Sequence, residues 1–256
     1  MERGFDFDVS AWPPLPRLRG LMVVGTDTGV GKTLIAGAIA RRLRLDGRRA
    51  AVFKPAASGC RHDRNDLISA DAEFLAACAD TTQSLAQITP VRFAQPLAPN
   101  VAAERLGQSV DLDAIFQAYR RLPQYGEVAV VEGIGGLLCP ISDDFWVIHF
   151  AKLIGLPLVL VARPGLGTIN HTLLTLHAAR SAGLHIAAVV INRFPGDNAP
   201  FDPSIAANPA QIAQRGKVDR IVLVTDEPDN DVEKATIAAA AEATIAQVPW
   251  AQIAGL

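Results

Sequence analysis

Long apolar runs and cysteine-rich patterns are both missing from this sequence. Its apolar stretches are interrupted by Gly, Pro or a charged residue before they reach the roughly 18 residues that a membrane span requires. The three cysteines, Cys60, Cys78 and Cys139, include no C-x-x-C pair, which argues against a zinc ribbon or a disulfide framework. We therefore expect a soluble protein in a reducing cytoplasm.

Blocks of like charge are also missing. The net charge is −2, and Lys and Arg are scattered along the chain, so the sequence gives no sign of a surface for nucleic acid or for an anionic membrane. Residues 1–19 contain three prolines but no basic region followed by an apolar one, so they do not resemble a signal peptide. We expect a loose N-terminal extension over 1–19, and small molecules as partners.

The remaining chain, residues 20–256, has the pattern of a single α/β domain. Short apolar runs rich in β-branched residues recur, with little polar alternation, as in parallel strands that helices cover on both faces. These runs are residues 21–24, 50–53, 128–131, 158–161, 187–191 and 221–224. The alternation predicts a three-layer, doubly wound fold around a mostly parallel sheet.

Between these runs, the apolar residues recur at the spacing of one face of a helix. This spacing predicts helices over residues 33–46, 69–79, 112–122, 170–182 and 232–245, the last being very rich in alanine. Residues 194–209 hold four prolines and little apolar periodicity. We expect that segment to be a long loop over the carboxyl ends of the strands.

The strongest motif lies between the first predicted strand and the first predicted helix. Residues 25–33 have the sequence GTDTGVGKT. In such a turn, backbone N–H groups and the positive end of the helix dipole hold the β-phosphate of a nucleotide, Lys32 adds a positive charge, and the Thr33 hydroxyl can bind Mg²⁺. The usual pattern has a glycine where this chain has Thr26, with Gly25 one position earlier. The alternative is a glycine-rich turn with no chemical role. The order of predicted strand, loop and helix favours nucleotide binding instead, and with it a sheet of the P-loop NTPase type.

Charged residues follow two other predicted strands. Lys54 and Ser58 stand in the sequence KPAASG at the carboxyl end of the second strand, where open α/β sheets bind ligands. A lysine there can face the γ-phosphate or simply be solvated. Glu132 ends the third strand in the sequence VEGIGG, and such an acid often serves Mg²⁺ in P-loop proteins. Asp71 is a second candidate ligand, with helix capping or a favourable interaction with the helix dipole as its alternative.

Two further segments are candidates for ligand contacts. The glycines after Glu132 allow a small substrate to lie against the backbone. The sequence GLGTINH at residues 165–171 again joins a strand to a helix, which offers backbone N–H groups to an anion such as a carboxylate. Asn192 closes the fifth strand and has amide groups that suit a base edge.

Together these residues resemble one family, dethiobiotin synthetase, through GTDTxVGKT, KPxxSG and VEGxGG in the same order. The resemblance covers about residues 20–192, including LGTINH. It implies an ATP- and Mg²⁺-dependent ligase that converts 7,8-diaminononanoate and CO₂ to dethiobiotin, ADP and phosphate through a carbamate and a carbamic-phosphoric anhydride. It also implies a homodimer in which the diamine lies across the interface.

The resemblance assigns roles to individual residues. Catalysis would fall to Lys32, Lys54 and Thr28. Nucleotide would be bound by Gly29, Val30, Gly31, Lys32, Thr33 and Asn192. The substrate would contact Ser58, Gly135 and, from the other subunit, Thr168, Ile169 and Asn170. Mg²⁺ would be held by Thr33, Asp71 and Glu132. The family often has an acid where this chain has Arg193, so the preference for ATP over another nucleoside triphosphate stays open.

Two alternatives remain. Partition and division ATPases share the sheet and phosphate loop and act as nucleotide switches, but they carry an extra lysine where this chain has Asp27. Another ATP-dependent ligase or amide synthase on the same scaffold would differ only in its acceptor; Lys54-Pro55 with Ser58-Gly59 argues against it. We expect measurements of ADP release, with and without the diamine and bicarbonate, to distinguish these alternatives from a dethiobiotin synthetase.

Overall fold

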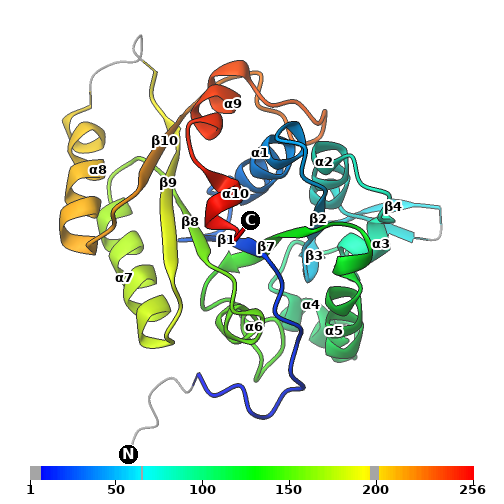
Figure 1. Ribbon diagram of the computed structural model, residues 1–256. Coiled ribbons are helices and arrows are strands. Elements are labelled where there is room, and N and C mark those ends of the chain that lie inside the picture. The colour runs from blue at the N-terminus through cyan, green and yellow to red at the C-terminus, as the bar shows by residue number, and fades with distance from the viewer. Residues whose placement is uncertain (1–6, 65, 197–201) are drawn as a thin grey trace, which may run out of the picture.

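A computed structural model describes residues 7–64, 66–196 and 202–256. Within them, six strands form one parallel sheet in the order β10-β9-β8-β1-β7-β2 (Figure 1). The strands are β1 Gly20–Gly25, β2 Ala50–Phe53, β7 Val128–Gly136, β8 Leu158–Ala162, β9 Ile186–Phe194 and β10 Ile221–Thr225. All six predicted strands are therefore confirmed, and the doubly wound fold class with them.

Two small ladders and the helices complete the chain. β3 Ala56–Ser58 pairs with β6 Val91–Phe93 in parallel, and β4 Arg61–Asp63 pairs with β5 Asp66–Ile68 in antiparallel. The helices are α1 Lys32–Leu45, α2 Ala70–Ala79, α3 Leu85–Ile88, α4 Pro99–Arg105, α5 Leu112–Arg120, η1 Leu122–Gln124, α6 Val147–Ile154, α7 Thr168–Ser181, α8 Pro203–Gly216, α9 Ala239–Ala246 and α10 Trp250–Ile253.

Helices bury both faces of the sheet, and the strand residues alternate between two apolar clusters. Phe53 and Val131 join the cluster that includes residues of α4 to α8, whereas Val52 and Val130 join the one that includes α1, α2, α9 and α10. Because successive side chains of a strand point to opposite faces, a strand covered on both sides must be apolar at every position. This explains why the apolar runs in the sequence are continuous.

The strand order decides where a ligand can bind. From β1 the chain crosses over to β2, on the far side of β7, and later it runs from β8 outward to β9 and β10. The carboxyl end of β1 therefore lies where the crossovers diverge, which is where open α/β sheets have their binding crevice. The loop after β1 is the phosphate-loop motif, residues 25–33.

The last predicted helix, 232–245, is wrong in its first half, since α9 begins only at Ala239. The Asp231 carboxylate accepts hydrogen bonds from the backbone N–H groups of Glu233 and Lys234, and Asp231 and Thr236 form a bridge. Ala235 has a φ of 54°. A turn fixed by an aspartate side chain thus overrides the helix propensity of these residues.

The predicted loop at 194–209 is also wrong in part. Residues 197–201 lie outside the described residues, but α8 begins at Pro203. Asp202 accepts from the Ser204 backbone N–H at 2.8 Å, and Pro203 occupies the first turn, where its missing N–H costs nothing. Pro209 lies inside this helix. Two contacts hold the helix against the rest of the fold: the side chain of Ile212 is buried, and Asn208 Nδ2 donates to the Pro164 carbonyl at 2.7 Å.

The division into an extension, 1–19, and one domain, 20–256, stays a prediction, but the described part of the extension is not loose. Trp12 packs against the rings of Phe145 and His149, with centroids 4.8 Å and 5.1 Å away. Leu15 is buried, and Lys152 Nζ donates to the Phe7 carbonyl at 2.8 Å. Apolar side chains spaced among the prolines provide enough contact to order residues 7–19 along α6 (Figure 1).

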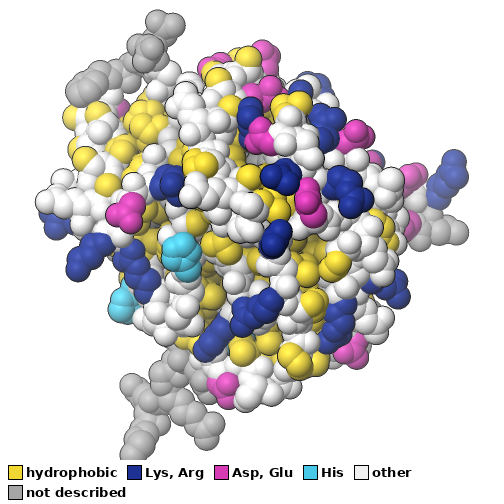
Figure 2. Space-filling view, in the orientation of Figure 1, with side chains coloured by type: hydrophobic (Ala, Val, Ile, Leu, Met, Phe, Trp, Pro, Cys, Tyr) yellow, Lys and Arg dark blue, Asp and Glu magenta, His cyan; other side chains and the backbone are white. Residues whose placement is uncertain are grey.

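The surface carries no obvious block of charge on the face in view. In Figure 2 the basic side chains are spread among acidic and uncharged ones and form no continuous positive area. None of the helices in the described ranges is both long and apolar enough to span a membrane.

Candidate active site

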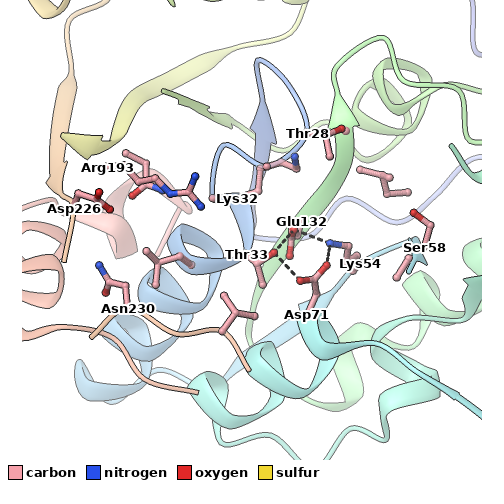
Figure 3. A pocket seen from close by; sticks show the side chains of 18 residues that line it. Thr28, Lys32, Thr33, Lys54, Ser58, Asp71, Glu132, Arg193, Asp226 and Asn230 are labelled. Atoms are coloured by element: carbon pink, nitrogen blue, oxygen red, sulfur yellow. Dashed lines mark hydrogen bonds and ion pairs between the residues drawn. The ribbon is translucent and has the colours of Figure 1, made fainter. Parts of the chain in front are cut away.

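A cavity of about 340 Å³ lies at the carboxyl edge of the sheet (Figure 3). Its lining comes from the loop after β1, from the ends of β2, β7, β9 and β10, and from α2. The predicted site residues that line it are Thr28, Gly29, Gly31, Lys32, Thr33, Lys54, Ser58, Asp71, Glu132, Gly135 and Asn192. The tertiary structure therefore brings together residues more than 160 positions apart in sequence, such as Thr28 and Asn192.

The phosphate loop is shaped by two glycines with positive φ, Gly29 (73°) and Gly31 (92°). Gly31 is the N-cap of α1, so the unpaired N–H groups of the first helical turn lie beside the cavity. Lys32 is buried and its Nζ donates to the Asp27 carbonyl at 3.0 Å. Burial lowers the pKa of Lys32, and the attraction of Glu132 only partly offsets it.

A side chain at Gly31 would collide with Asn192. A Cβ built there would lie 2.0 Å from Asn192 Nδ2, whereas one at Gly29 would meet no atom of the described residues within 4 Å. Asn192 is buried and its Nδ2 donates to the Val30 carbonyl at 3.0 Å. Val30 itself does not line the cavity; its backbone connects the phosphate loop to the end of β9.

Lys54 lies at the centre of the site and is buried rather than solvated, with 6% of its surface exposed. Its Nζ donates to Glu132 Oε1 at 2.8 Å and to Asp71 Oδ2 (Figure 3). The Thr33 hydroxyl contacts the same two carboxylates, at 3.0 Å from Asp71 Oδ1 and 2.9 Å from Glu132 Oε1. Four residues, from α1, α2, β7 and the position directly after β2, thus converge on one point.

Lys54 and Asp71 stabilise each other's charge, whereas burial holds the pKa of Glu132 above its usual value despite the nearby Lys54. Burial acts to lower the pKa of Lys54, but Glu132 and Asp71 outweigh it and hold that pKa above its usual value. Burial acts to raise the pKa of Asp71, but the nearby Lys54 ammonium outweighs it and holds it below its usual value. Lys54 is therefore a cation and Asp71 an anion at neutral pH.

Asp71 does not cap its helix. Ser69 is the N-cap of α2, and its hydroxyl accepts from the Ala72 N–H. Asp71, one residue into the helix, is free to point into the cavity. The capping alternative for Asp71 is therefore wrong, and the serine two residues earlier performs that role.

The donor set suits Mg²⁺. Glu132 Oε2 is buried and has no hydrogen-bond partner among the described residues, so one carboxylate oxygen remains for a ligand. A hydroxyl and two carboxylates are the hard oxygen ligands that Mg²⁺ takes, together with phosphate oxygens and water. Thr33, Asp71 and Glu132 can therefore hold this ion.

Sequence reasoning missed part of one end of the cavity. Arg193, Asp226, Asn230 and Val232 also line it, beside Asn192. Asp226 follows β10 directly, and the carboxyl end of a strand was the signal that identified Lys54 and Glu132. Applied to the sixth strand, the same rule would have found Asp226.

Comparison with known proteins identifies the family to which this chain belongs. A family model described as an AAA domain matches residues 19–234. An ATP-dependent dethiobiotin synthetase of Anaeromyxobacter sp. (strain K) is 42% identical over 212 residues, 83% of this chain and 92% of the relative. One of Bacillus subtilis (strain 168) is 37% identical over 213 residues, 82% of this chain and 91% of the relative. The chain belongs to the dethiobiotin synthetase family. The resemblance inferred from the three motifs is confirmed.

Two solved structures have the same fold as this member of the dethiobiotin synthetase family. A McdA–ATP complex of Cyanothece aligns with a TM-score of 0.57 at 14% identity, over 92% of this chain and 96% of that one. The cell division ATPase MinD of Pyrococcus furiosus gives 0.52 at 15% identity, over 92% and 98%. At these identities the likeness shows the fold alone.

Three substrate residues assigned through the dethiobiotin synthetase family resemblance, Thr168, Ile169 and Asn170, do not line the cavity of their own chain. They form the start of α7, after Gly167 with a φ of 91°. Thr168 is buried, and its Oγ1 has no hydrogen-bond partner within the described part of the chain. Ser58, Gly135 and Thr28, in contrast, line the cavity. Gly135 lies close to Thr28, since a Cβ built on Gly135 would be 3.6 Å from Thr28 Oγ1.

Proposed function

We propose that this chain is an ATP-dependent dethiobiotin synthetase that closes a cyclic urea on 7,8-diaminononanoate with CO₂. The observation that carries the proposal is the convergence of Lys32, Lys54 and Thr33 with two carboxylates in one cavity. Cations there can bring two anions together, a carbamate and a triphosphate, which repel each other in water. Family membership supplies the identity of the acceptor.

The first task of the site is to keep the attacking amine uncharged. An amine attacks CO₂ only as the free base, and it loses a proton as the carbamate forms. Lys54, held as an ammonium by its two carboxylates, disfavours a second ammonium nearby, and Lys32 adds to this repulsion. Ser58 and the backbone at Gly135 hold the diamine on the side of the cavity beyond Lys54.

The second task is phosphoryl transfer. A carbamate oxygen forms a bond to the γ-phosphorus while the bond to the ADP oxygen breaks. Lys32 and the N–H groups at the start of α1 hold the phosphates, and Lys54 approaches the transferred group. Mg²⁺, held by Thr33, Asp71 and Glu132, would neutralise phosphate charge when bound. Thr28, at the tip of the loop, donates its hydroxyl to the reacting groups.

The third task is ring closure. The second amine attacks the carbonyl carbon of the anhydride, and the bond to phosphate breaks. No nucleophile from the protein is required, because both nitrogens belong to one substrate and the step is intramolecular. The site contributes by holding the chain of the diamine still.

We also propose that the protein is a homodimer in the cytoplasm. Leu166, in the loop before α7, is 84% exposed and Leu174, on α7, is 60% exposed, and a second copy would cover them. The start of α7 would then bring Thr168, Ile169 and Asn170 to the substrate tail in the partner's cavity. Cys60, Cys78 and Cys139 are free thiols, which suits a reducing compartment.

ADP release tests the proposed reaction. We expect release from ATP and Mg²⁺ to require both the diamine and bicarbonate, with dethiobiotin formed in equal amount. A nucleotide switch would release ADP whether or not either is present. Another ligase on this scaffold would need a different acceptor, so release that ignores the diamine contradicts the proposal.

A further inference from the structure

A second cavity, of about 520 Å³, lies at the amino edge of the sheet, opposite the edge that carries the candidate active site. Its lining comes from residues at or just before the starts of β8, β9 and β10, from the ends of α7 and α8, and from α10. α7 and α8 lie side by side next to β9 and β10 (Figure 1). A volume of this size holds a small organic molecule. We call it the amino-edge pocket and define it as Gly155, Pro157, Arg180, residues 185–187, residues 217–220, Gln252 and Ile253.

Part of the lining is apolar. Pro157, Ile186, Val218 and Ile253 line the amino-edge pocket and are half-buried. Ile186 and Val218 pack on one side against one apolar cluster of the core, and Ile253 packs against the other cluster. A ligand that covers their remaining surface gains affinity in proportion to the apolar area removed from water. The pocket therefore favours a ligand with an apolar body over a fully polar ion.

The charged part of the lining is mainly basic. Arg180, Lys217 and Arg220 line the pocket together with one carboxylate, Asp219. None of these four side chains forms an ion pair within residues 7–64, 66–196 and 202–256. Three cations that no carboxylate neutralises attract an anion, whereas Asp219 repels one of high charge. A singly charged anion fits this balance.

Hydrogen bonds to the backbone orient both guanidinium groups. Arg180 Nη2 donates to the Lys217 carbonyl at 3.0 Å, and Arg220 Nη1 donates to the Ala187 carbonyl at 3.2 Å. Each bond engages one nitrogen of the guanidinium group and leaves its other N–H donors for a ligand. A carboxylate suits such donors, because arginine can bind it through two parallel hydrogen bonds.

Helix ends alone do not explain this set of basic residues. Arg180 lies in the last turn of α7 and Lys217 is the C-cap of α8, where a cation also interacts favourably with the helix dipole. His185 and Arg220, however, directly precede the strands β9 and β10. Basic groups from four separate segments therefore gather at one pocket.

Part of the pocket lies outside the region that the family model matches, residues 19–234. Gln252 and Ile253 of α10 belong to its lining. Arg17, from the N-terminal extension, lies so close to Gly155 that a Cβ built on Gly155 would overlap its guanidinium group. The amino-edge pocket is thus separate from the nucleotide and diamine sites assigned through the family.

We propose that the amino-edge pocket is a binding site for a small monocarboxylate with an apolar body. The carboxylate accepts hydrogen bonds from the remaining donors of Arg180 and Arg220 and lies beside the Lys217 ammonium. The apolar body covers Ile186 and Val218. This inference goes beyond the proposed function and does not depend on it.

Binding of octanoate to the full chain tests the two halves of this chemistry. Isothermal titration calorimetry compares octanoate with 1-octanol, which has the chain without the charge, and with acetate, which has the charge almost without the chain. We expect octanoate to bind at least about tenfold more tightly than either, the scale of one hydrogen bond to a charged group. Its affinity should also fall as salt is added. Equal affinities for the three compounds, or no saturable binding of octanoate, would overturn the proposal.

A pair of variants locates the binding. The Lys217 side chain makes no hydrogen bond or ion pair in the described part of the chain, so Lys217→Gln should leave thermal unfolding unchanged and raise the Kd of octanoate about tenfold. Arg105→Gln is the matched control, since Arg105 is also exposed in the last turn of a helix but does not line the pocket. We expect it to leave the Kd unchanged. A Kd that Lys217→Gln does not alter, or that both variants raise equally, would place octanoate elsewhere and refute the site.

Discussion

The two ends of the cavity differ in how their polar groups are satisfied. At the phosphate end, Lys54, Asp71, Glu132 and Thr33 are tied to one another by short contacts, and Lys54 and Glu132 are almost fully buried. The opposite end, which we call the base end, is formed by Asn192, Arg193, Asp226, Asn230 and Val232. Arg193 and Asp226 are exposed there, and their side chains make no hydrogen bond or ion pair among the described residues. One end is preorganised before a ligand arrives, whereas the other offers groups that a ligand must pair.

Under the proposed function, the phosphate end would perform the catalysis and the other end would contact the rest of the nucleotide. Preorganised charges are suited to act on a transferred phosphate because they need no rearrangement as charge develops. Because Arg193 and Asp226 are exposed, we expect substitutions of these two residues to cost little stability. Substitutions at the two ends should therefore affect different measurements.

The largest effect is expected from Lys54→Ala. The change removes the ammonium that we propose faces the transferred phosphate. We therefore expect turnover to fall about a hundredfold or more, with nucleotide affinity nearly unchanged, since Lys32 and the loop remain. Steady-state ADP release and calorimetric ATP binding measure the two quantities.

Lys234→Ala is the control for this substitution. Lys234 is exposed, and within the described part of the chain its side chain pairs only with Asp231, at 2.9 Å, so its loss should change neither quantity. Normal turnover by Lys54→Ala would show that the phosphate end does not do the chemistry and would remove the distinction between the two ends.

A smaller effect is expected where the two ends meet. In Gly31→Ala the new methyl group must displace the Asn192 amide, so we expect nucleotide affinity to fall at least about tenfold and unfolding free energy to fall by about 2 to 3 kcal/mol. Gly29→Ala adds backbone strain only, about 1 kcal/mol, because nothing lies near its Cβ. Thermal unfolding and ATP titration compare the pair, and equal losses would mean that contact with Asn192 is unimportant.

The smallest effect concerns the loop of the base end. Asn230→Ala removes the acceptor for the Ala238 N–H, which we expect to cost about 1 kcal/mol of unfolding free energy. Asn230→Asp keeps an acceptor and should lose less stability. Urea unfolding of both variants measures this, and a loss above that of Gly31→Ala would contradict the view that the base end is uncoupled from the core.

Short sequence patterns predicted the structure correctly where one kind of interaction dominates. The six apolar runs predicted six strands because both faces of the sheet are buried, and GTDTGVGKT predicted the turn before α1 because glycines and the helix start are adjacent in sequence. They failed at residues 232–238, where an aspartate turn outweighs alanine propensity, and at α8, where packing tolerates Pro209. Around Trp12, ring contacts with Phe145 and His149 join segments more than 130 residues apart, which no local pattern reveals.

The sequence by itself determined the strand pattern, the phosphate loop and the family, because each depends on residues close together in the chain. Only the tertiary structure decided that Lys54 is buried between Asp71 and Glu132, that Ser69 rather than Asp71 caps α2, and that Asp226 and Asn230 face the same cavity as Asn192. These facts depend on strand order, which brings the carboxyl ends of strands distant in sequence to one edge, and on burial, which decides whether a charge must find a partner.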